Sequence, residues 1–184
     1  PAGAVPRAVA TSTVPEPVVF NSDQNPSEQV GMMSLPAATL ERVLMGIEIG
    51  YPDQKAEREL IIVKYRRKQI KQLEPVISSD ELLELQQAVD QVHISKALLD
   101  YLLALIRSSR LSPWFSTGLS PRAGLALQKC AQAWALLQGR DHVLPEDIQF
   151  ITPSVAAHRL LINSDYQNED IDSLIDRLIK QVPV

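Results

Sequence analysis

The chain has 184 residues, of which 45% are hydrophobic and 22% charged, a balance typical of globular proteins and not of disordered ones. Its 18 basic and 22 acidic side chains give a net charge of −4, which argues against a nucleic-acid or membrane-surface role for the whole chain. One cysteine excludes an internal disulfide framework, and no stretch is apolar for long enough to span a bilayer. We therefore expect a cytoplasmic protein without a nucleic-acid partner.

The first fifty residues contain few elements. Residues 1–17 carry four prolines, which is typical of an extended connection. Residues 18–20 form a β-branched and aromatic run that ends in polar residues, and they are the one strand that the sequence predicts. A single strand is not stable alone, so its partners would lie elsewhere. A short helix is predicted over residues 37–45, with Arg42 on its exposed edge.

The next segment combines a helix with a basic run. Asp53 is a suitable N-cap for a helix whose inward face contains Ala56, Leu60 and Val63. Residues 64–71 then contain five cations in eight positions. Such a run is either a nucleic-acid patch or a solvated face, and we favour the solvated face.

From Ser78 onward the sequence predicts helices with clear start signals. Ser78 and Glu81 form a capping box, and Ser95 caps a helix that runs to about Arg107. That helix is apolar nearly all round, so we expect it at the centre of the fold. Residues 112–115 are expected to form an exposed aromatic loop.

The following helix begins with an arginine in its first turn. Ser120 is a good N-cap, Pro121 suits the first helical position, and Gly139 is expected near the C-terminal end. Arg122 lies where the helix dipole is positive, so a phosphate from outside the chain would gain from both the arginine and the free amides. An apolar stripe on this helix contains Leu127, Cys130, Ala131, Trp134 and Leu137, and Cys130 is expected in the core.

Three further helices complete the prediction. Pro145 begins one, although Leu144 is a poor cap, and Thr152 with Pro153 begins another through Leu161. Asn168 is expected to cap the last helix, which has its basic residues at the back, as the dipole prefers. The predicted fold class is therefore mainly α, a helical bundle that follows a strand and a short helix.

Few residues carry recognisable chemistry. The sequence contains no glycine-rich phosphate loop, no apolar strand ending in Asp-Glu and no nucleophile motif of the form G-x-S-x-G. The histidines at 93, 142 and 158 are widely spaced, so no metal site is predicted. The remaining candidates for a functional site are Asn25, Arg42 and Arg122. Taken singly, Asn25 could equally be an ordinary turn residue, and each arginine an ordinary surface residue.

Two groups of short motifs resemble a known family in order and spacing. The first resembles the second half of the core of a MoxR-type AAA+ ATPase and comprises residues 23–31, Leu35-Pro36, Leu40-Glu41-Arg42 and Gly50-Tyr51-Pro52-Asp53. The second resembles the helical lid of that family and comprises residues 92–95, 120–123, 139–141, 145–147 and 158–161. The resemblance covers roughly residues 15–184. The chain departs from the family pattern at Ser22-Asp23 and at residues 36–39.

The resemblance implies roles for three residues. Asn25 corresponds to sensor 1, which orients the attacking water or contacts the γ-phosphate. Arg42 corresponds to the arginine finger, which reaches the nucleotide site of the next subunit. Arg122 corresponds to sensor 2, which binds the nucleotide from the lid of its own subunit.

The resemblance also implies a domain organisation and a function. Residues 1–52 would be the C-terminal part of the AAA+ core, and residues 53–184 the helical lid. The full-length protein would form a homo-oligomeric ring, expected to be a hexamer, which uses ATP and Mg²⁺ to remodel or activate partners such as metalloenzymes or proteins with von Willebrand factor A-type domains. Because the Walker A and Walker B segments are missing here, this chain alone should not hydrolyse ATP. The alternative is a free-standing helical interaction module without nucleotide chemistry.

Overall fold

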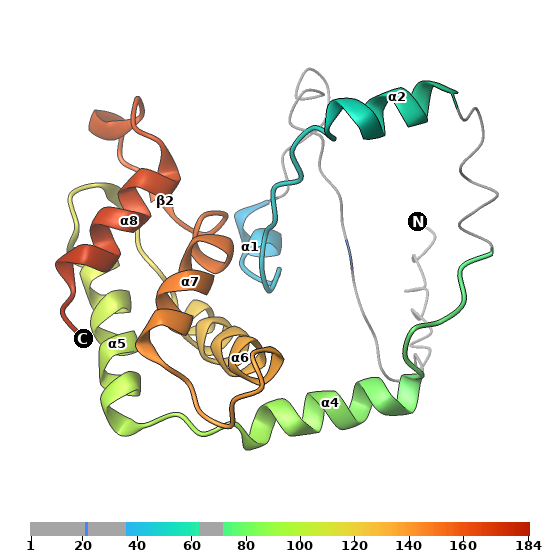
Figure 1. The fold of residues 1–184 in the computed structure, drawn as a ribbon. Coiled ribbons are helices and arrows are strands. Elements are labelled where there is room, and N and C mark those ends of the chain that lie inside the picture. Colours follow the sequence, from blue (N-terminus) through green and yellow to red (C-terminus); the bar gives the residue numbers. More distant parts are fainter. Residues whose placement is uncertain (1–20, 22–35, 63–71) are drawn as a thin grey trace, which may run out of the picture.

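The computed structural model describes residues 21, 36–62 and 72–184, and the described part is mainly helical (Figure 1), which confirms the predicted fold class. The elements in chain order are α1 (Ala37–Leu40), α2 (Gln54–Ile62), α4 (Ser79–Gln91), α5 (Lys96–Leu111), β1 (Phe115–Thr117), α6 (Pro121–Leu137), α7 (Pro145–Ala156), β2 (Leu161–Ile162), the 3₁₀ helix η2 (Ser164–Tyr166) and α8 (Ile171–Gln181). Of the helices described, none has the length and apolarity needed to cross a membrane. The predicted strand at 18–20 and the basic run at 64–71 lie outside the described residues.

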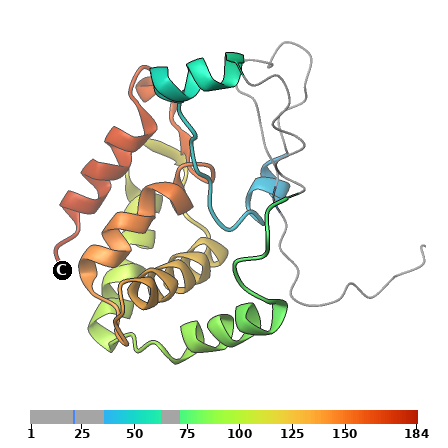
Figure 2. The same ribbon diagram turned by 45° about the vertical axis from the view of Figure 1, so that its right-hand side comes forward.

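The hydrophobic core is built around α6, shown in gold in Figures 1 and 2. This helix contacts α4, α5 and α7, and α8 packs against both α5 and α7. The buried face of α6 consists mainly of small side chains, including Ala123, Ala131 and Ala135, none of which is exposed at all. Small side chains allow neighbouring helices to approach closely, so α6 can be covered on several sides.

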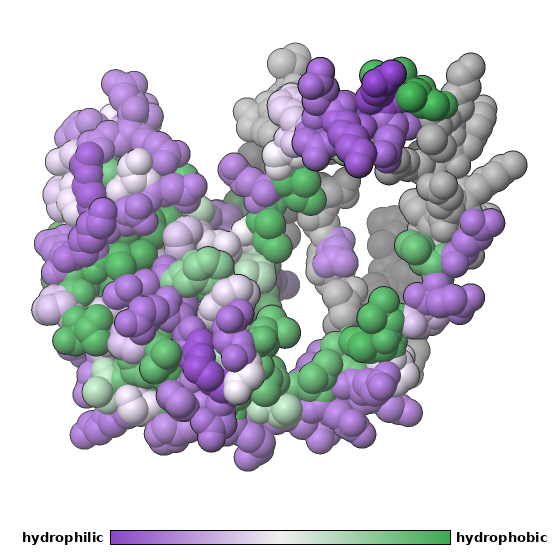
Figure 3. All heavy atoms as spheres, viewed as in Figure 1, coloured by the Kyte–Doolittle hydropathy of each residue, from purple (hydrophilic) through white to green (hydrophobic). Residues whose placement is uncertain are grey.

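The predicted helix starts in the second half of the chain are mostly confirmed. Ser78 and Glu81 form the capping box of α4, and the Ser95 hydroxyl accepts a hydrogen bond from the Leu98 amide at the start of α5. The α5 helix buries Leu98, Tyr101, Leu102, Leu105 and Ile106, as expected for a central helix. By contrast, α4 buries none of its residues, and Figure 3 shows hydrophobic side chains along one side of it.

The region around Phe115 differs from its prediction as an exposed loop. Phe115 begins β1, pairs with Ile162 of β2 in an antiparallel two-stranded sheet, and is only 6% exposed. The Trp114 carbonyl accepts from the Asn163 amide at 2.8 Å, which extends the pairing. The loop is ordered by a segment almost fifty residues further along, a contact that its own sequence does not encode.

Three predicted boundaries are wrong for identifiable reasons. No helix begins at Thr152, because α7 continues through Pro153 and the Thr152 hydroxyl donates back to the Ile148 carbonyl at 2.6 Å. The last helix is capped by Asp170, whose carboxylate accepts from the Ser173 amide, and not by Asn168. The first helix ends at Leu40, well before the predicted 45.

Burial along α6 gives a matched pair for a stability measurement. Leu127 is 0% exposed and Leu125, half a turn away, is 66% exposed. Leu127→Ala should lower the free energy of unfolding by about 2–5 kcal/mol, because it removes buried methyl groups and leaves a cavity. Leu125→Ala should change it by no more than about 0.5 kcal/mol. Chemical denaturation of both variants measures the difference, and similar losses for both would contradict this placement of the α6 core face.

Candidate functional site

The start of α6 has the geometry predicted for Arg122. The Ser120 hydroxyl accepts a hydrogen bond from the Ala123 amide at 3.2 Å, and Pro121 occupies the first helical position. Arg122 lies in the exposed part of the first turn, whereas Ala123 next to it is fully buried. The guanidinium therefore extends to the surface from a helix whose other face is fixed in the core.

The loop before α6 is bound tightly to the end of α5. The buried Ser109 hydroxyl donates to the Ile106 carbonyl at 2.7 Å and accepts from the Leu119 amide at 2.9 Å. The Arg110 Nε donates to the Leu119 carbonyl at 2.8 Å. A Cβ on Gly118 would lie 2.7 Å from the backbone of Arg110, so only glycine permits this approach. These residues determine where α6 begins, and sequence reasoning missed them.

The second predicted arginine lies close to the same helix start. The Glu41 carboxylate accepts a hydrogen bond from the Ser120 hydroxyl, and Arg42 is the next residue in the chain. Arg42 and Arg122 are both exposed, and neither guanidinium makes a hydrogen bond or ion pair with another described residue. The structure thus brings two of the three predicted site residues near one contact. The third, Asn25, lies outside the described residues.

A second set of contacts attaches the chain after Arg42 to the end of α7. The Arg159 guanidinium donates to the carbonyls of Val43 and Leu44, the latter at 3.2 Å. It also donates to the carbonyl of Val155, which lies in the last turn of α7. The Gly46 amide donates to the Ser154 carbonyl at 2.8 Å. His158 Nε2 lies 3.1 Å from the Val43 carbonyl oxygen, and the neutral tautomer with its proton on Nε2 donates to it.

Burial determines the electrostatics of this attachment. Burial lowers the pKa of Arg159, an effect that the Glu41 carboxylate opposes and the Arg122 guanidinium reinforces. Burial also lowers the pKa of His158, although its hydrogen bond to the Val43 carbonyl acts in the opposite direction. His158 is therefore neutral at pH 7. Arg122, Arg159 and Glu41 form one cluster of interacting charges at the start of α6.

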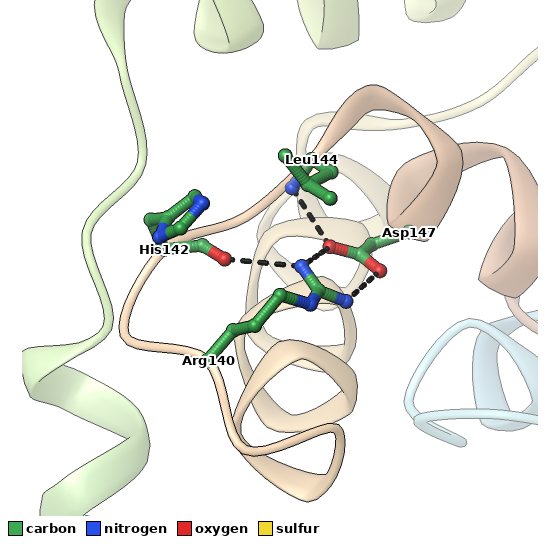
Figure 4. A network of polar contacts seen from close by, with 4 residues as sticks. All are labelled: Arg140, His142, Leu144 and Asp147. Carbon is green, nitrogen blue, oxygen red and sulfur yellow. Dashed lines mark hydrogen bonds and ion pairs between the residues drawn. The ribbon is translucent and has the colours of Figure 1, made fainter.

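The opposite end of α6 carries a polar network with a structural role (Figure 4). Arg140 binds both carboxylate oxygens of Asp147, at 2.7 and 2.6 Å, and the same carboxylate accepts from the Leu144 amide. Burial alone would raise the pKa of Asp147, but the hydrogen bonds from Arg140 and Leu144 lower it below the usual range. Asp147 thus stabilises the start of α7 by accepting from the Leu144 amide, although Leu144 has no side-chain group that can cap the helix.

Comparisons with known proteins agree with this architecture. Residues 107–178 match the family model described as the AAA lid domain. The crystal structure of a candidate ATPase from Cytophaga hutchinsonii superposes with a TM-score of 0.75 at 28% identity, over 87% of this chain and 52% of that one. The helix that carries Arg122 and the turn after α7 that carries Arg159 therefore belong to the lid of an AAA+ protein.

The curated relatives identify the family. Over 94% of the present chain, the sequence is 33% identical to the protein named Chaperone MoxR1 of Mycobacterium tuberculosis. Over 89% of the present chain, it is 27% identical to the protein MoxR of Paracoccus denitrificans. It is also 32% identical to the uncharacterized protein YeaC of Bacillus subtilis over 95% of its length. The chain belongs to the MoxR family of AAA+ ATPases and corresponds to the C-terminal region with its lid. It spans about half the length of these relatives, between 48% and 55%.

The buried Ser109 hydroxyl leads to a prediction with a neighbouring control. Ser109→Ala removes the acceptor of the buried Leu119 amide and should lower the free energy of unfolding by about 1–3 kcal/mol. Ser108→Ala is a change of the same type one position earlier in α5; the Ser108 hydroxyl makes no hydrogen bond with another described residue, so this change should alter the free energy of unfolding by less than about 0.5 kcal/mol. Thermal or chemical unfolding distinguishes the two. Equal effects would show that the α5 contact does not fix the loop before α6.

The lowered pKa of His158 predicts a pH dependence of stability. The unfolded histidine binds a proton near its ordinary pKa of about 6.5, while the folded one binds it only at lower pH. The free energy of unfolding should therefore fall as the pH is lowered below about 6.5. His158→Gln should flatten this part of the profile. Identical profiles for the wild type and His158→Gln would contradict the prediction.

Proposed function

We propose that this chain is the ATP-sensing and interface-forming part of an AAA+ ring that hydrolyses ATP and remodels or activates partner proteins. Arg42 acts as the arginine finger on the nucleotide of the neighbouring subunit, and Arg122 acts as sensor 2 on the nucleotide of its own subunit. Asn25 is assigned to sensor 1 through the family resemblance. We extend the proposal to a hexameric ring and to client proteins that are metalloenzymes or contain von Willebrand factor A-type domains.

One observation carries the proposal. Two exposed arginines lie next to the Glu41 to Ser120 contact, and neither is engaged by another described residue. Desolvating unpaired arginines would be costly, so they are kept at the surface and are available to bind an anion. A guanidinium beside the start of a long helix is suited to a phosphate group, because the helix dipole adds partial positive charge there.

The residues present fit part of an ATP–Mg²⁺ site. Arg42 and Arg122 could contact phosphate oxygens and stabilise the charge that develops during phosphoryl transfer. The described residues contain no group of three or more potential metal ligands. Mg²⁺, which neutralises charge on the phosphates when bound, would therefore be held by other parts of the protein.

Mixing of inactive subunits of the full-length protein tests the two roles. Subunits with Arg42→Ala keep an intact nucleotide site, and subunits with a disrupted phosphate loop keep an intact arginine finger. Mixed rings should regain turnover, because some interfaces pair the intact finger with the intact site. A finger supplied in trans accelerates hydrolysis roughly 10³–10⁵-fold, so even a minority of such interfaces is measurable.

Arg122→Ala serves as the matched arginine variant. Mixed with the same phosphate-loop variant it should stay inactive, because both lesions then affect the sites of their own subunits. Arg42 and Arg122 both lie close to the contact between Glu41 and Ser120, so rescue of Arg122→Ala would also be informative. Equal rescue of both variants would show that the two arginines act on the same neighbouring nucleotide, and full activity of unmixed Arg42→Ala would remove Arg42 from the proposed mechanism.

A further inference from the structure

The chain on both sides of Arg42 is attached to the lid, through a side chain before it and through main-chain carbonyls after it. Before it, the Glu41 carboxylate accepts from the Ser120 hydroxyl at the start of α6. After it, the carbonyls of Val43 and Leu44 accept from the Arg159 guanidinium. The Arg42 side chain itself is exposed. Its direction is therefore set by the main chain that carries it and by the attachments of that main chain.

Arg159 is unusual among the basic residues of the lid in its burial. It is 7% exposed, although most arginines in proteins keep the guanidinium in water. Its donors bind three main-chain carbonyls, two from the segment after Arg42 and one from Val155. A planar guanidinium presents its donors in a fixed arrangement, so binding consecutive carbonyls fixes the orientation of the peptide between them. A lysine could carry the charge but could not bind both carbonyls with this geometry.

The neighbouring contacts strengthen the same attachment. The Gly46 amide donates to the Ser154 carbonyl, and His158 approaches the Val43 carbonyl. A Cβ on Gly46 would lie 3.4 Å from the His158 Nδ1, so the segment lies directly against the histidine ring. Residues 43–46 thus dock on the end of α7 through main-chain groups. A movement of α7 would move these residues with it.

We propose that Arg159 is a positioning residue for Arg42, which orients the arginine finger from the lid through the carbonyls of Val43 and Leu44. This inference rests on the proposed function of Arg42. It assigns to the lid a second task beside nucleotide sensing: the lid that carries Arg122 also determines where the finger of the same subunit points. The two subunit interfaces of one protomer are then coupled through α6 and α7.

Steady-state kinetics of the full-length protein tests the proposal with Arg159→Lys. A misplacement of a catalytic group by about 1 Å costs on the order of 10²-fold in rate, so kcat should fall by roughly that factor. The dissociation constant for ATP should change less than threefold, since the finger acts mainly in the transition state. Adding Arg42→Ala to Arg159→Lys should give no further loss beyond Arg42→Ala alone. Multiplied losses in the double variant would overturn the proposal.

Subunit mixing provides a readout that a merely structural role would not affect. Arg159→Lys subunits should regain turnover when mixed with subunits whose phosphate loop is disrupted, as Arg42→Ala subunits do. Arg177 is an exposed arginine of α8 that pairs with Glu169. The control variant Arg177→Lys should keep wild-type turnover. Lack of rescue would overturn the positioning role. If Arg42→Ala itself leaves turnover unchanged, the proposed function of Arg42 fails. If Arg42→Ala abolishes turnover and Arg159→Lys leaves it unchanged, only the present inference about Arg159 fails.

Hydrogen exchange separates positioning from general stabilisation of the lid. The Gly46 amide monitors docking of the segment, and amides within α6 monitor the lid core. Arg159→Lys should accelerate exchange at Gly46 by about tenfold or more and leave exchange within α6 unchanged. Equal acceleration at both places, or none at Gly46, would overturn the proposal.

Discussion

The burial of α6 is the constraint on which the rest of the described structure depends. Its inward face is made largely of alanines with no exposed area, so α4, α5 and α7 can all contact it. Gly124 shows how close this approach is, because a Cβ there would lie 2.7 Å from the Ile106 Cδ1. A helix covered on several sides cannot rotate about its axis without losing many buried contacts. The direction of Arg122, an exposed residue in the first turn, is therefore determined by hydrophobic burial further along the helix.

Much of the fold that was predictable from the sequence depends on local contacts at helix starts. The caps at Ser78, Ser95 and Ser120 each bind an amide three residues away, and all three are confirmed. The small sheet was missed because Phe115 pairs with Ile162, and strands this short carry no periodic signal. The stripe of α6 was extended too far, since Leu137 is 77% exposed near the helix end. The error at the small sheet thus falls where a distant segment determines the local structure, whereas the misplaced helix starts at Thr152 and Asn168 concern contacts within four residues.

The candidate site was predictable only in part, for a similar reason. The family resemblance pointed to Arg42 and Arg122, and the structure places both near the start of α6. It did not point to Ser109 or Arg159 as positioning residues, because both act mainly on main-chain groups. Every residue has a main-chain carbonyl, whatever its side chain. The amino acids at positions 43 and 44, 116 and 115 residues before Arg159, therefore do not reveal that their carbonyls accept hydrogen bonds from it. The clearest sequence signal was indirect: Arg159 directly precedes the apolar residues 160–162 after α7.

The attachment of residues 41–46 to the lid bears on how the domains are divided. The family resemblance assigns this segment to the core, with the lid beginning at residue 53, and that boundary remains a prediction. Yet a buried guanidinium needs acceptors, and the Nε of Arg159 already has none among the described residues. Without residues 43 and 44, Arg159 would keep only the Val155 carbonyl as a described acceptor. The lid therefore depends on a segment from the predicted core to satisfy one of its own buried charges. Because the same segment carries Arg42, the hydrogen bonds that satisfy Arg159 also hold the main chain next to the proposed arginine finger.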